Sequence, residues 1–226
     1  MKILISSSNG DHIMIHQDNI KLNLKLQLFA HIAKQPAFHQ FRSVEQLGYI
    51  TALKQRNDSG VWGIQFVIQS TVKDPAQLDG RVEGFLKMFE DKLYEMTDDQ
   101  FKSNVNALID MKLEKYKNLR EESTVYCREI SDGTLRFDRQ ESEVAALREL
   151  TKQELFEFFN SYIKVDAPQR KTLSIQVYGC LHSAEFQSSI HESSSLQNCQ
   201  IRDIFSFKRS RPFYGSFRGG LGQMKL

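Results

Sequence analysis

The sequence predicts an α+β domain of two layers, with helices packed on one face of a mostly antiparallel sheet. Two observations lead to this expectation: segments with a strand-like pattern lie toward both ends, and a block of amphipathic helical segments lies between them. A length of 226 residues, 40% of them hydrophobic, is enough to bury one core. We divide the chain into an N-terminal segment over residues 1–18, an α+β domain over 19–180, and a Ser-rich segment and tail over 181–226.

The first element lies within residues 18–34, and its pattern admits two interpretations. The apolar residues alternate with polar ones, as in a half-buried strand, but several of them also share one helical face. Leucine, lysine and glutamine favour helix over strand, so we predict a helix that Asp18 caps and that Pro36 ends.

A β-hairpin is predicted next. Residues 49–53 should be extended, and the Asn-Asp-Ser-Gly sequence at 57–60 is typical of a turn. After this turn, apolar residues alternate with less apolar ones, which indicates the second strand of the hairpin. Its buried residues are expected to be Ile64, Phe66 and Ile68.

Two helices follow the hairpin. Asp74 and Pro75 supply the N-cap and the first residue of a helix with a continuous apolar stripe. Thr97 and Gln100 form a capping box that begins the second helix, and we expect the two to pack as a helical hairpin. The stripe of the first helix consists of Leu78, Val82, Phe85, Leu86, Phe89 and Leu93.

The remaining elements complete the α+β pattern. Residues 121–133 predict a helix that ends at Gly133, and Thr151 with Glu154 forms a second capping box. A last strand is predicted through Leu173 and its alternating neighbours.

Composition excludes several classes of partner. The chain has 30 Lys and Arg against 28 Asp and Glu. The net charge of +2 is too small to produce an overall positive potential that would attract nucleic acid or a membrane surface. The apolar runs are far shorter than the roughly 20 residues of a membrane-spanning helix. The three cysteines form no CxxC pair, which indicates a reducing compartment without a structural zinc knuckle.

Metal sites within the chain are not expected. His12 and His16 stand four residues apart but have no glutamate between them, whereas catalytic zinc needs about three protein ligands and a carboxylate. His182 and Glu185 resemble half of an inverted HxxEH motif that lacks its second histidine. A further hypothesis is an independent zinc enzyme built on His12 and His16, which stoichiometric, tightly bound zinc would support. We found no GxSxG, GxGxxG or GxxxxGK[ST] motif.

The segment from Phe38 to Tyr49, with the sequence FHQFRSVEQLGY, is the most informative one. It resembles the FxxLRTxEQLGY signature in the C-terminal half of insulin-degrading enzymes and their pitrilysin-family relatives, which are inverted-motif zinc metallopeptidases. Phe41, Ser43 and Val44 depart from the signature, whereas its arginine and tyrosine are present. The resemblance covers residues 22–178 and is weaker over 1–18 and after 181. It is also supported by the sequences GIQFVIQS at 63–70, RVEGFL at 81–86, MTDDQF at 96–101 and VDAPQR at 165–170.

This resemblance implies a divided active site. Family members fold as four related α+β domains in two halves, and the zinc and its ligands belong to the N-terminal half, so no zinc ligand is expected in this chain. The implied catalytic residues are Arg42 and Tyr49, which with Phe38 also bind substrate. A guanidinium and a phenol can bind the oxygen on which negative charge grows when a peptide bond is hydrolysed. The implied partners are a peptide substrate and the zinc-bearing N-terminal half, and a homo-oligomer stays an open option.

The resemblance therefore implies the C-terminal portion of a zinc-dependent metalloendopeptidase, inactive when it is alone. The alternative is a stand-alone, non-catalytic module that binds peptides or pairs with another subunit. The C-terminal Met224-Lys225-Leu226 resembles the Ser-Lys-Leu type of peroxisomal address, so we expect the cytosol or the peroxisome, and a peroxisomal member of the family is one expectation.

Overall fold

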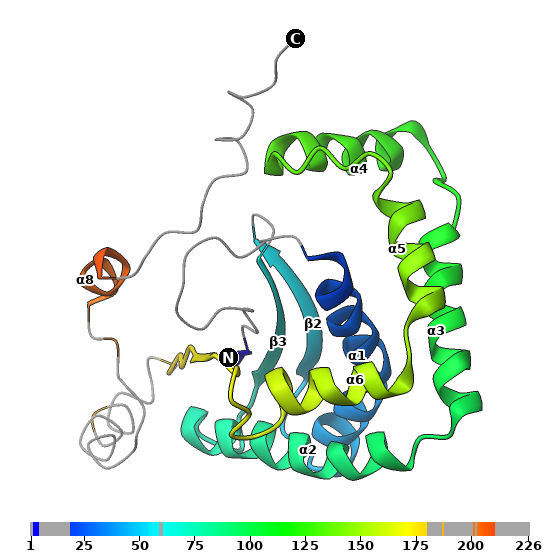
Figure 1. Ribbon diagram of the computed structural model, residues 1–226. Helices are drawn as coiled ribbons and strands as arrows, with labels where there is room; N and C mark the ends of the chain where they lie inside the picture. Colours follow the sequence, from blue (N-terminus) through cyan, green and yellow to red (C-terminus); the bar gives the residue numbers. More distant parts are fainter. Residues whose placement is uncertain are drawn as a thin grey trace.

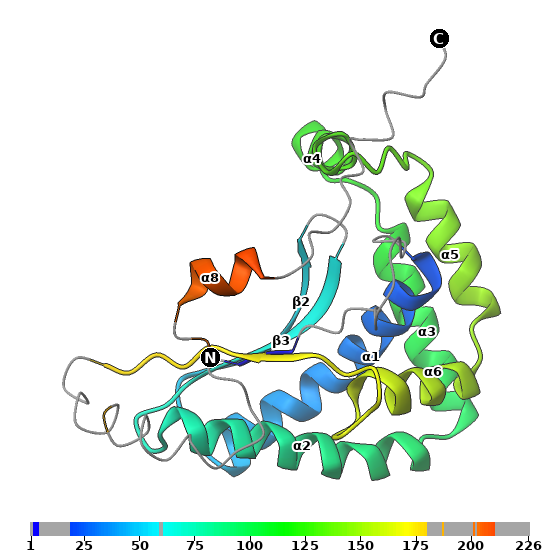
Figure 2. The ribbon, with the colours of Figure 1, turned by 60° about the vertical axis from the view of Figure 1, so that its left-hand side comes forward.

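A small antiparallel sheet forms one layer of the molecule, and helices cover one of its faces (Figures 1 and 2). The structure is a computed structural model that describes residues 2–4, 19–58, 61–179, 187, 201 and 203–210. The predicted α+β class is confirmed. In the described part of the chain, no helix is both long and apolar enough to cross a membrane.

Four strands pair in the order β2-β3-β1-β4, all antiparallel: β1 Lys2–Leu4, β2 Ile50–Asp58, β3 Val61–Gln69 and β4 Thr172–Ser174. The predicted hairpin is confirmed as β2 and β3, and the three alternating residues of β3 are buried. Strand β1 was not predicted, and it lies between β3 and β4, with Lys2 opposite both Phe66 and Ser174.

Helix α1 (Ile20–Phe38) packs on the sheet through β2 and β3 and is also in contact with α3, α5 and α6. The helical interpretation is confirmed, although the N-cap is Asn19, whose side chain accepts a hydrogen bond from the Leu22 N–H at 3.0 Å. A helix surrounded on several sides buries residues around most of its circumference. This explains why α1 also buries residues outside the one helical face that the sequence indicates.

Pro36 does not end α1, contrary to the prediction. The helix passes through Pro36 to Phe38 and continues as a π-helix, η1 (His39–Val44). Proline removes one backbone donor from a helix. Here Ala33, Ala37 and Phe41 are each at most 1% exposed, so burial of this face holds the backbone helical across the proline.

Helices α2 (Pro75–Glu95) and α3 (Asp98–Leu113) begin at the predicted caps, with Asp74 and Thr97 as N-caps, and the whole predicted stripe of α2 is buried. The expected helical hairpin is wrong. The extended backbone of Met96 turns α3 away from α2, and α3 packs against α1 and α5 instead (Figure 1).

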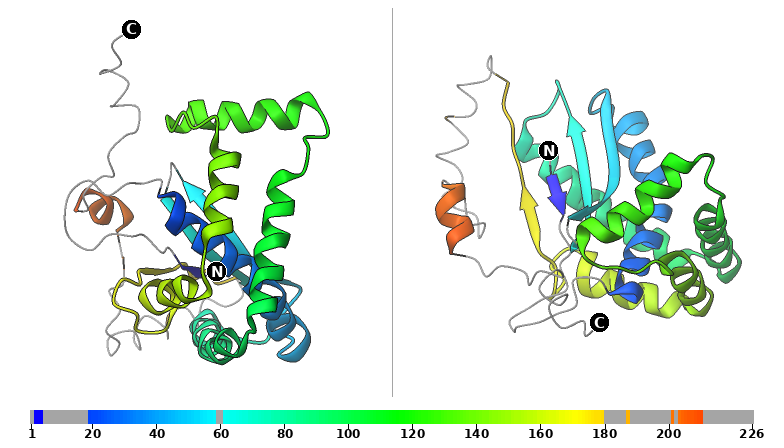
Figure 3. Two further views of the ribbon diagram at one scale, coloured as in Figure 1. Left: turned by 45° about the vertical axis from the view of Figure 1, so that its right-hand side comes forward. Right: turned by 90° about the horizontal axis from the view of Figure 1, so that it is seen from above.

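The later helices are α4 (Leu119–Asp132), α5 (Arg139–Glu149), α6 (Lys152–Phe158), the π-helix η2 (Phe159–Ile163) and α8 (Ile204–Arg209). Helix α4 ends as predicted at Gly133, which has a φ of 73°. Figures 1 and 3 show α4 away from the sheet, beyond the ends of α3 and α5. Helix α5 was not predicted; its two apolar core residues, Val144 and Leu147, are too few to produce a clear stripe.

Candidate functional site

Arg42 and Tyr49 lie in direct contact near the end of η1. The Arg42 Nη1 group donates to the backbone oxygens of Gly48, at 3.1 Å, and of Tyr49. The guanidinium carbon lies 4.6 Å from the centroid of the Tyr49 ring, which is a cation–π arrangement. The Tyr49 side chain is nonetheless exposed, because 85% of the residue is open to solvent. The structure therefore brings together two of the three predicted site residues on an accessible surface.

Phe38 is the last residue of α1 and directly precedes η1. It is 47% exposed, whereas Phe41, three residues later, is buried at 1% exposure. Its position four residues before Arg42 places an apolar side chain on the same helical segment as the guanidinium.

The segment from Glu45 to Tyr49 connects η1 to β2, and two of its residues fix its path. Leu47 is fully buried, and its N–H donates to the Phe41 oxygen at 2.9 Å. Gly48 lies against the end of β3, so closely that an added Cβ would stand 1.9 Å from the Gln69 oxygen. Residue 48 is therefore glycine because its backbone lies so close to the backbone of Gln69 that no side chain fits. The left-handed residue of this turn is Gln46, with a φ of 50°.

Glu45 was not identified from the sequence as a site residue, although it lies in the same turn, three residues after Arg42. Its carboxylate accepts two hydrogen bonds from Arg81 of α2, Nε to Oε2 at 2.6 Å and Nη2 to Oε1 at 2.7 Å. It accepts a third from Gln40 Nε2 at 2.8 Å. The hydrogen bonds from Arg81 lower the pKa of Glu45 below its usual value. The hydrogen bond from Gln40 and the positive charges of Arg81 and Lys73 act in the same direction, whereas partial burial acts against them.

Comparison with known proteins decides the family of the chain. A family model described as the PQQ synthase PqqF-like C-terminal lobe domain 4 matches residues 28–127, a range that contains the whole site. The chain is 59% identical over 215 residues to insulin-degrading enzyme-like 1, peroxisomal, of Arabidopsis thaliana. The chain belongs to the insulin-degrading enzyme family. It corresponds to a C-terminal part of these proteins.

Other members of the insulin-degrading enzyme family and one solved structure agree with this assignment. Human insulin-degrading enzyme is 36% identical over 202 residues, which cover 85% of this chain. A crystal structure of pitrilysin aligns with a TM-score of 0.61 and 28% identity over 71% of the chain and 16% of pitrilysin. The match to the Arabidopsis relative covers 95% of this chain and 22% of that protein, and the human match covers 20% of the human enzyme. The chain thus spans about a fifth of the relatives it matches.

The zinc implied by the insulin-degrading enzyme family does not fit the residues that the structure describes. Among them, no three His, Cys, Asp or Glu side chains gather as a metal site would require. Arg42 and Tyr49 do not form a zinc site, since a guanidinium is not a ligand that zinc takes in proteins. The pairs His12 with His16 and His182 with Glu185 lie outside the described residues.

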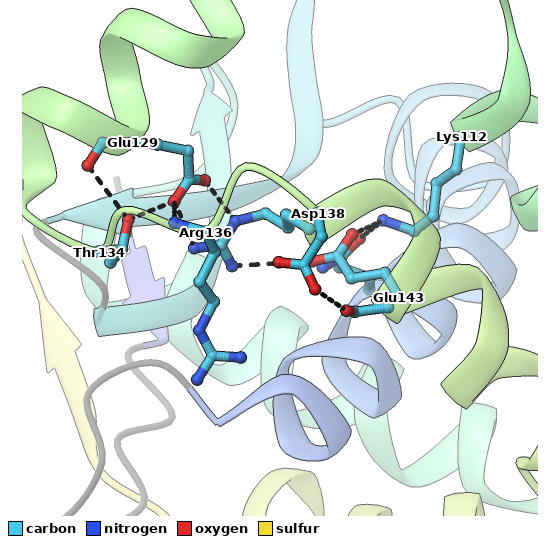
Figure 4. A network of polar contacts seen from close by, with 9 residues as sticks. Lys112, Glu129, Thr134, Arg136, Asp138 and Glu143 are labelled. Atoms are coloured by element: carbon cyan, nitrogen blue, oxygen red, sulfur yellow. Dashed lines mark hydrogen bonds and ion pairs between the residues drawn. The ribbon is translucent and has the colours of Figure 1, made fainter.

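A second cluster of charged side chains joins α3, α4 and α5 (Figure 4). Glu129 of α4 is 6% exposed and accepts hydrogen bonds from Thr134, from the Arg136 backbone at 3.2 Å, and from Arg139 Nη2 at 3.0 Å. Burial raises the pKa of Glu129, but the hydrogen bonds from Arg139 and Thr134 and the charge of Arg139 bring it below its usual value.

Arg139 also links this cluster to α3 through Glu143. Arg139 lies 3.9 Å from Glu143, and Glu143 accepts from Lys112 Nζ at 2.5 Å. Lys112 also donates to Gln27 of α1 at 2.7 Å. Each buried carboxylate is thus held by a cation, so the arrangement fixes the helices relative to one another and leaves neither carboxylate placed as a general base. An open cavity of about 540 Å³ at the N-terminal half of α4 is lined by Tyr116, Asn118, Arg120, Glu121, Thr124 and Val125.

Proposed function

We propose that this chain supplies Arg42, Tyr49 and Phe38 to a zinc-dependent metalloendopeptidase, in which they bind the peptide beside the bond that is cleaved. The observation that carries the proposal is the contact between the half-buried Arg42 and the exposed Tyr49, held together by stacking and by hydrogen bonds to the turn. Membership of the insulin-degrading enzyme family supports the reaction class.

Arg42 and Tyr49 have the chemistry to stabilise the reacting carbonyl group. A guanidinium carries five N–H donors, and the two described hydrogen bonds use only its Nη1 group. Its other donors and the Tyr49 hydroxyl can therefore bind a peptide carbonyl and the negative charge that grows on its oxygen during hydrolysis. Because the turn already holds Arg42, little ordering is needed when substrate binds. Phe38 would contact an apolar side chain of the peptide.

Zinc belongs, in this proposal, to a different part of the enzyme, because the described residues do not gather a set of ligands. The zinc-bearing N-terminal half is then the necessary partner, and the chain alone is inactive. The chain spans 22% of its Arabidopsis relative, which is consistent with a contribution to a larger enzyme.

The test uses a chimera in which this chain replaces the matching region of the Arabidopsis relative. We expect Arg42→Ala and Tyr49→Phe to lower kcat/KM on a quenched fluorescent peptide by roughly 100- to 1000-fold, the usual cost of losing an oxyanion donor. Bound zinc, measured by atomic absorption, should stay equimolar. Arg148→Ala, at an exposed position of α5, is the matched control and should change neither quantity. Loss of zinc in the Arg42 variant, or unchanged turnover, would contradict the assignment.

The alternative is a stand-alone module that binds peptides or pairs with another subunit without catalysis. The observation that favours it is the exposed Tyr49 in contact with Arg42, with no metal cluster among the described residues. An antibody against residues 74–117 would distinguish the two by the mass of the native polypeptide on a denaturing gel. A band several times larger than 26.2 kDa supports the peptidase, whereas a band at that mass supports the module.

We further propose a peroxisomal location, which the name of the Arabidopsis relative supports. Met224-Lys225-Leu226 lies outside the described residues, so its role rests on the sequence alone. A fluorescent protein fused to the N-terminus should colocalise with a peroxisomal marker and become cytosolic when these three residues are removed. Cytosolic fluorescence of the intact fusion would contradict this location.

A further inference from the structure

We propose that Glu45 is a positioning residue: its ion pair with Arg81 holds the turn that carries Arg42 and Tyr49 in the conformation that binds peptide. This inference rests on the function proposed above. It assigns a task to two residues outside the predicted site, one in the turn and one on a separate helix.

The contact between Glu45 and Arg81 has the geometry of a directional restraint. Both carboxylate oxygens of Glu45 accept from the guanidinium of Arg81, at 2.6 and 2.7 Å, so the two planar groups are fixed in orientation as well as in distance. Gln40 adds a hydrogen bond to the same carboxylate at 2.8 Å. The turn is thereby attached to α2 on one side and to η1 on the other.

Movement of Glu45 would reach Arg42 through the backbone. Glu45 ends η1, and its N–H donates to the Gln40 oxygen at 2.9 Å. Three and four residues later come the carbonyl groups of Gly48 and Tyr49, which accept from Arg42. Leu47 and Gly48 anchor the second half of this turn to the core and to β3, whereas the carboxylate of Glu45 attaches the first half to α2.

Stability alone is a weak reason for this pair. The Arg81 side chain is 45% exposed and that of Glu45 is 10% exposed, and an ion pair that is partly open to solvent contributes only modestly to the free energy of unfolding. The pair can still restrain the turn, because a restraint depends on the fixed direction of the two hydrogen bonds and not on a large contribution to stability. We therefore expect its loss to change the site far more than the stability of the domain.

The chain offers a matched control on the same helix. Glu83, two residues after Arg81, accepts two hydrogen bonds from Arg170, at 2.8 and 2.7 Å. This pair is also bidentate, although Arg170 donates through Nη1 and Nη2 where Arg81 donates through Nε and Nη2, and it joins α2 to the segment before β4. Glu45→Gln and Glu83→Gln therefore make the same chemical change at two arginine pairs of α2.

The first measurement is peptide turnover in the chimera described above. Glu45→Gln should lower kcat/KM roughly 10- to 100-fold, mainly through kcat, since a displacement of about 1 Å in a catalytic group costs up to about 100-fold. Glu83→Gln should stay close to the parent. The charge reversal Glu45→Arg with Arg81→Glu should recover most of the activity that Arg81→Glu alone loses. Equal losses in Glu45→Gln and Glu83→Gln, or no recovery in the double variant, would overturn the proposal.

The second measurement does not depend on catalysis, so it separates this inference from the proposed function. In the full 226-residue chain, the Nε–H resonance of Arg42 should be displaced by the ring current of Tyr49, and Arg42→Lys identifies it. Glu45→Gln should move this resonance toward its position in Tyr49→Leu, whereas Glu83→Gln should leave it in place. An unmoved resonance in Glu45→Gln overturns the positioning role even if Arg42 proves essential. A moved resonance supports that role even if Arg42→Ala leaves turnover intact.

Discussion

Gly48 lies too close to the end of β3 for a side chain to be added without movement of the backbone. The limiting atom is the backbone oxygen of Gln69, which cannot rotate away as the end of a flexible side chain could. The neighbouring Tyr49 is held between this contact and Arg42, so the position of its ring depends on the absence of a Cβ at residue 48.

We expect Gly48→Ala to destabilise the chain by about 1–3 kcal/mol, the usual cost of overpacking. Gly84→Ala is the opposite case, because no atom lies within 4 Å of its added Cβ and it stands inside α2. That change should stabilise by about 0.5–1 kcal/mol through the helix preference of alanine. Urea unfolding of both variants is the measurement, and a Gly48→Ala chain as stable as the parent would show that β3 can move aside.

The site could be predicted only where residues are close together in the sequence. Arg42 and Tyr49 lie in one short signature, so resemblance alone identified them as site candidates. Arg81 belongs to another segment that supports the resemblance, RVEGFL, but it lies 36 positions after Glu45 in the chain. A single sequence does not reveal which charged residues meet across such a separation, because surface charges occur on every helix.

Helix boundaries were predicted best where capping residues determine them. Asp74, Thr97 and Thr151 accept hydrogen bonds from the first turns of α2, α3 and α6, so local chemistry fixes these starts. The prediction that Pro36 ends the helix was wrong because it considered only the backbone hydrogen bond that proline removes. The burial that outweighs this loss involves elements far away in the sequence. The direction of α3 failed for the same reason, since tertiary packing sets it.

The attachment of α4 depends on one buried carboxylate. Leu119 and Ile130 of this helix are 78% and 58% exposed, and Glu129 is the residue of α4 that is buried. Glu129 accepts two hydrogen bonds from Arg139 of α5 and others from the connection between the two helices. The orientation of α4 is thus set by polar contacts more than by apolar packing.

Glu129→Gln should therefore destabilise the chain at neutral pH, by about 1–3 kcal/mol, the cost of leaving buried partners unsatisfied. The pKa of Glu129 is lowered in the folded state, so its contribution is fully present above the unfolded value of about 4.3 and is lost as the pH falls through the lower folded value. The stability gap between variant and parent should consequently narrow below about pH 4. Urea midpoints between pH 7 and pH 3 measure this gap, and Glu149→Gln, at an exposed position of α5, is the control. A gap that is constant with pH would argue against the ion pair.

A continuous group of aromatic side chains joins the elements of the two layers. Phe41 of η1 lies 5.3 Å from Phe85 of α2 and 6.2 Å from Phe66 of β3, as measured between ring centroids. From Phe85 the group continues through Phe89 to Phe29 of α1 and Phe159 of η2. The candidate site is therefore built directly on the core, since Arg42 follows Phe41.

Phe85→Ala should lower the free energy of unfolding by about 3–5 kcal/mol, the range for removing a buried phenylalanine. Because Phe85 packs against Phe41, any variant that still folds should also shift the Arg42 resonance used above. Phe205→Ala, at a position of α8 that is 71% exposed, should change stability by no more than about 0.5 kcal/mol. Chemical denaturation gives both values. Similar losses in the two variants would contradict the placement of the core.

The pairing of β1 with β4 has a consequence for the order in which the molecule assembles. These strands come from opposite ends of the described chain, yet Lys2 pairs with Ser174 and Leu4 with Thr172. During synthesis the hairpin and the helices from α1 to α6 leave the ribosome before β4 does, so the sheet remains open at β1 until residue 174 has emerged. Closing so long a loop is slow compared with forming a hairpin. Until then the free edge of β1 is a site where another strand can pair, and a chaperone that shields it would favour the native sheet over aggregation.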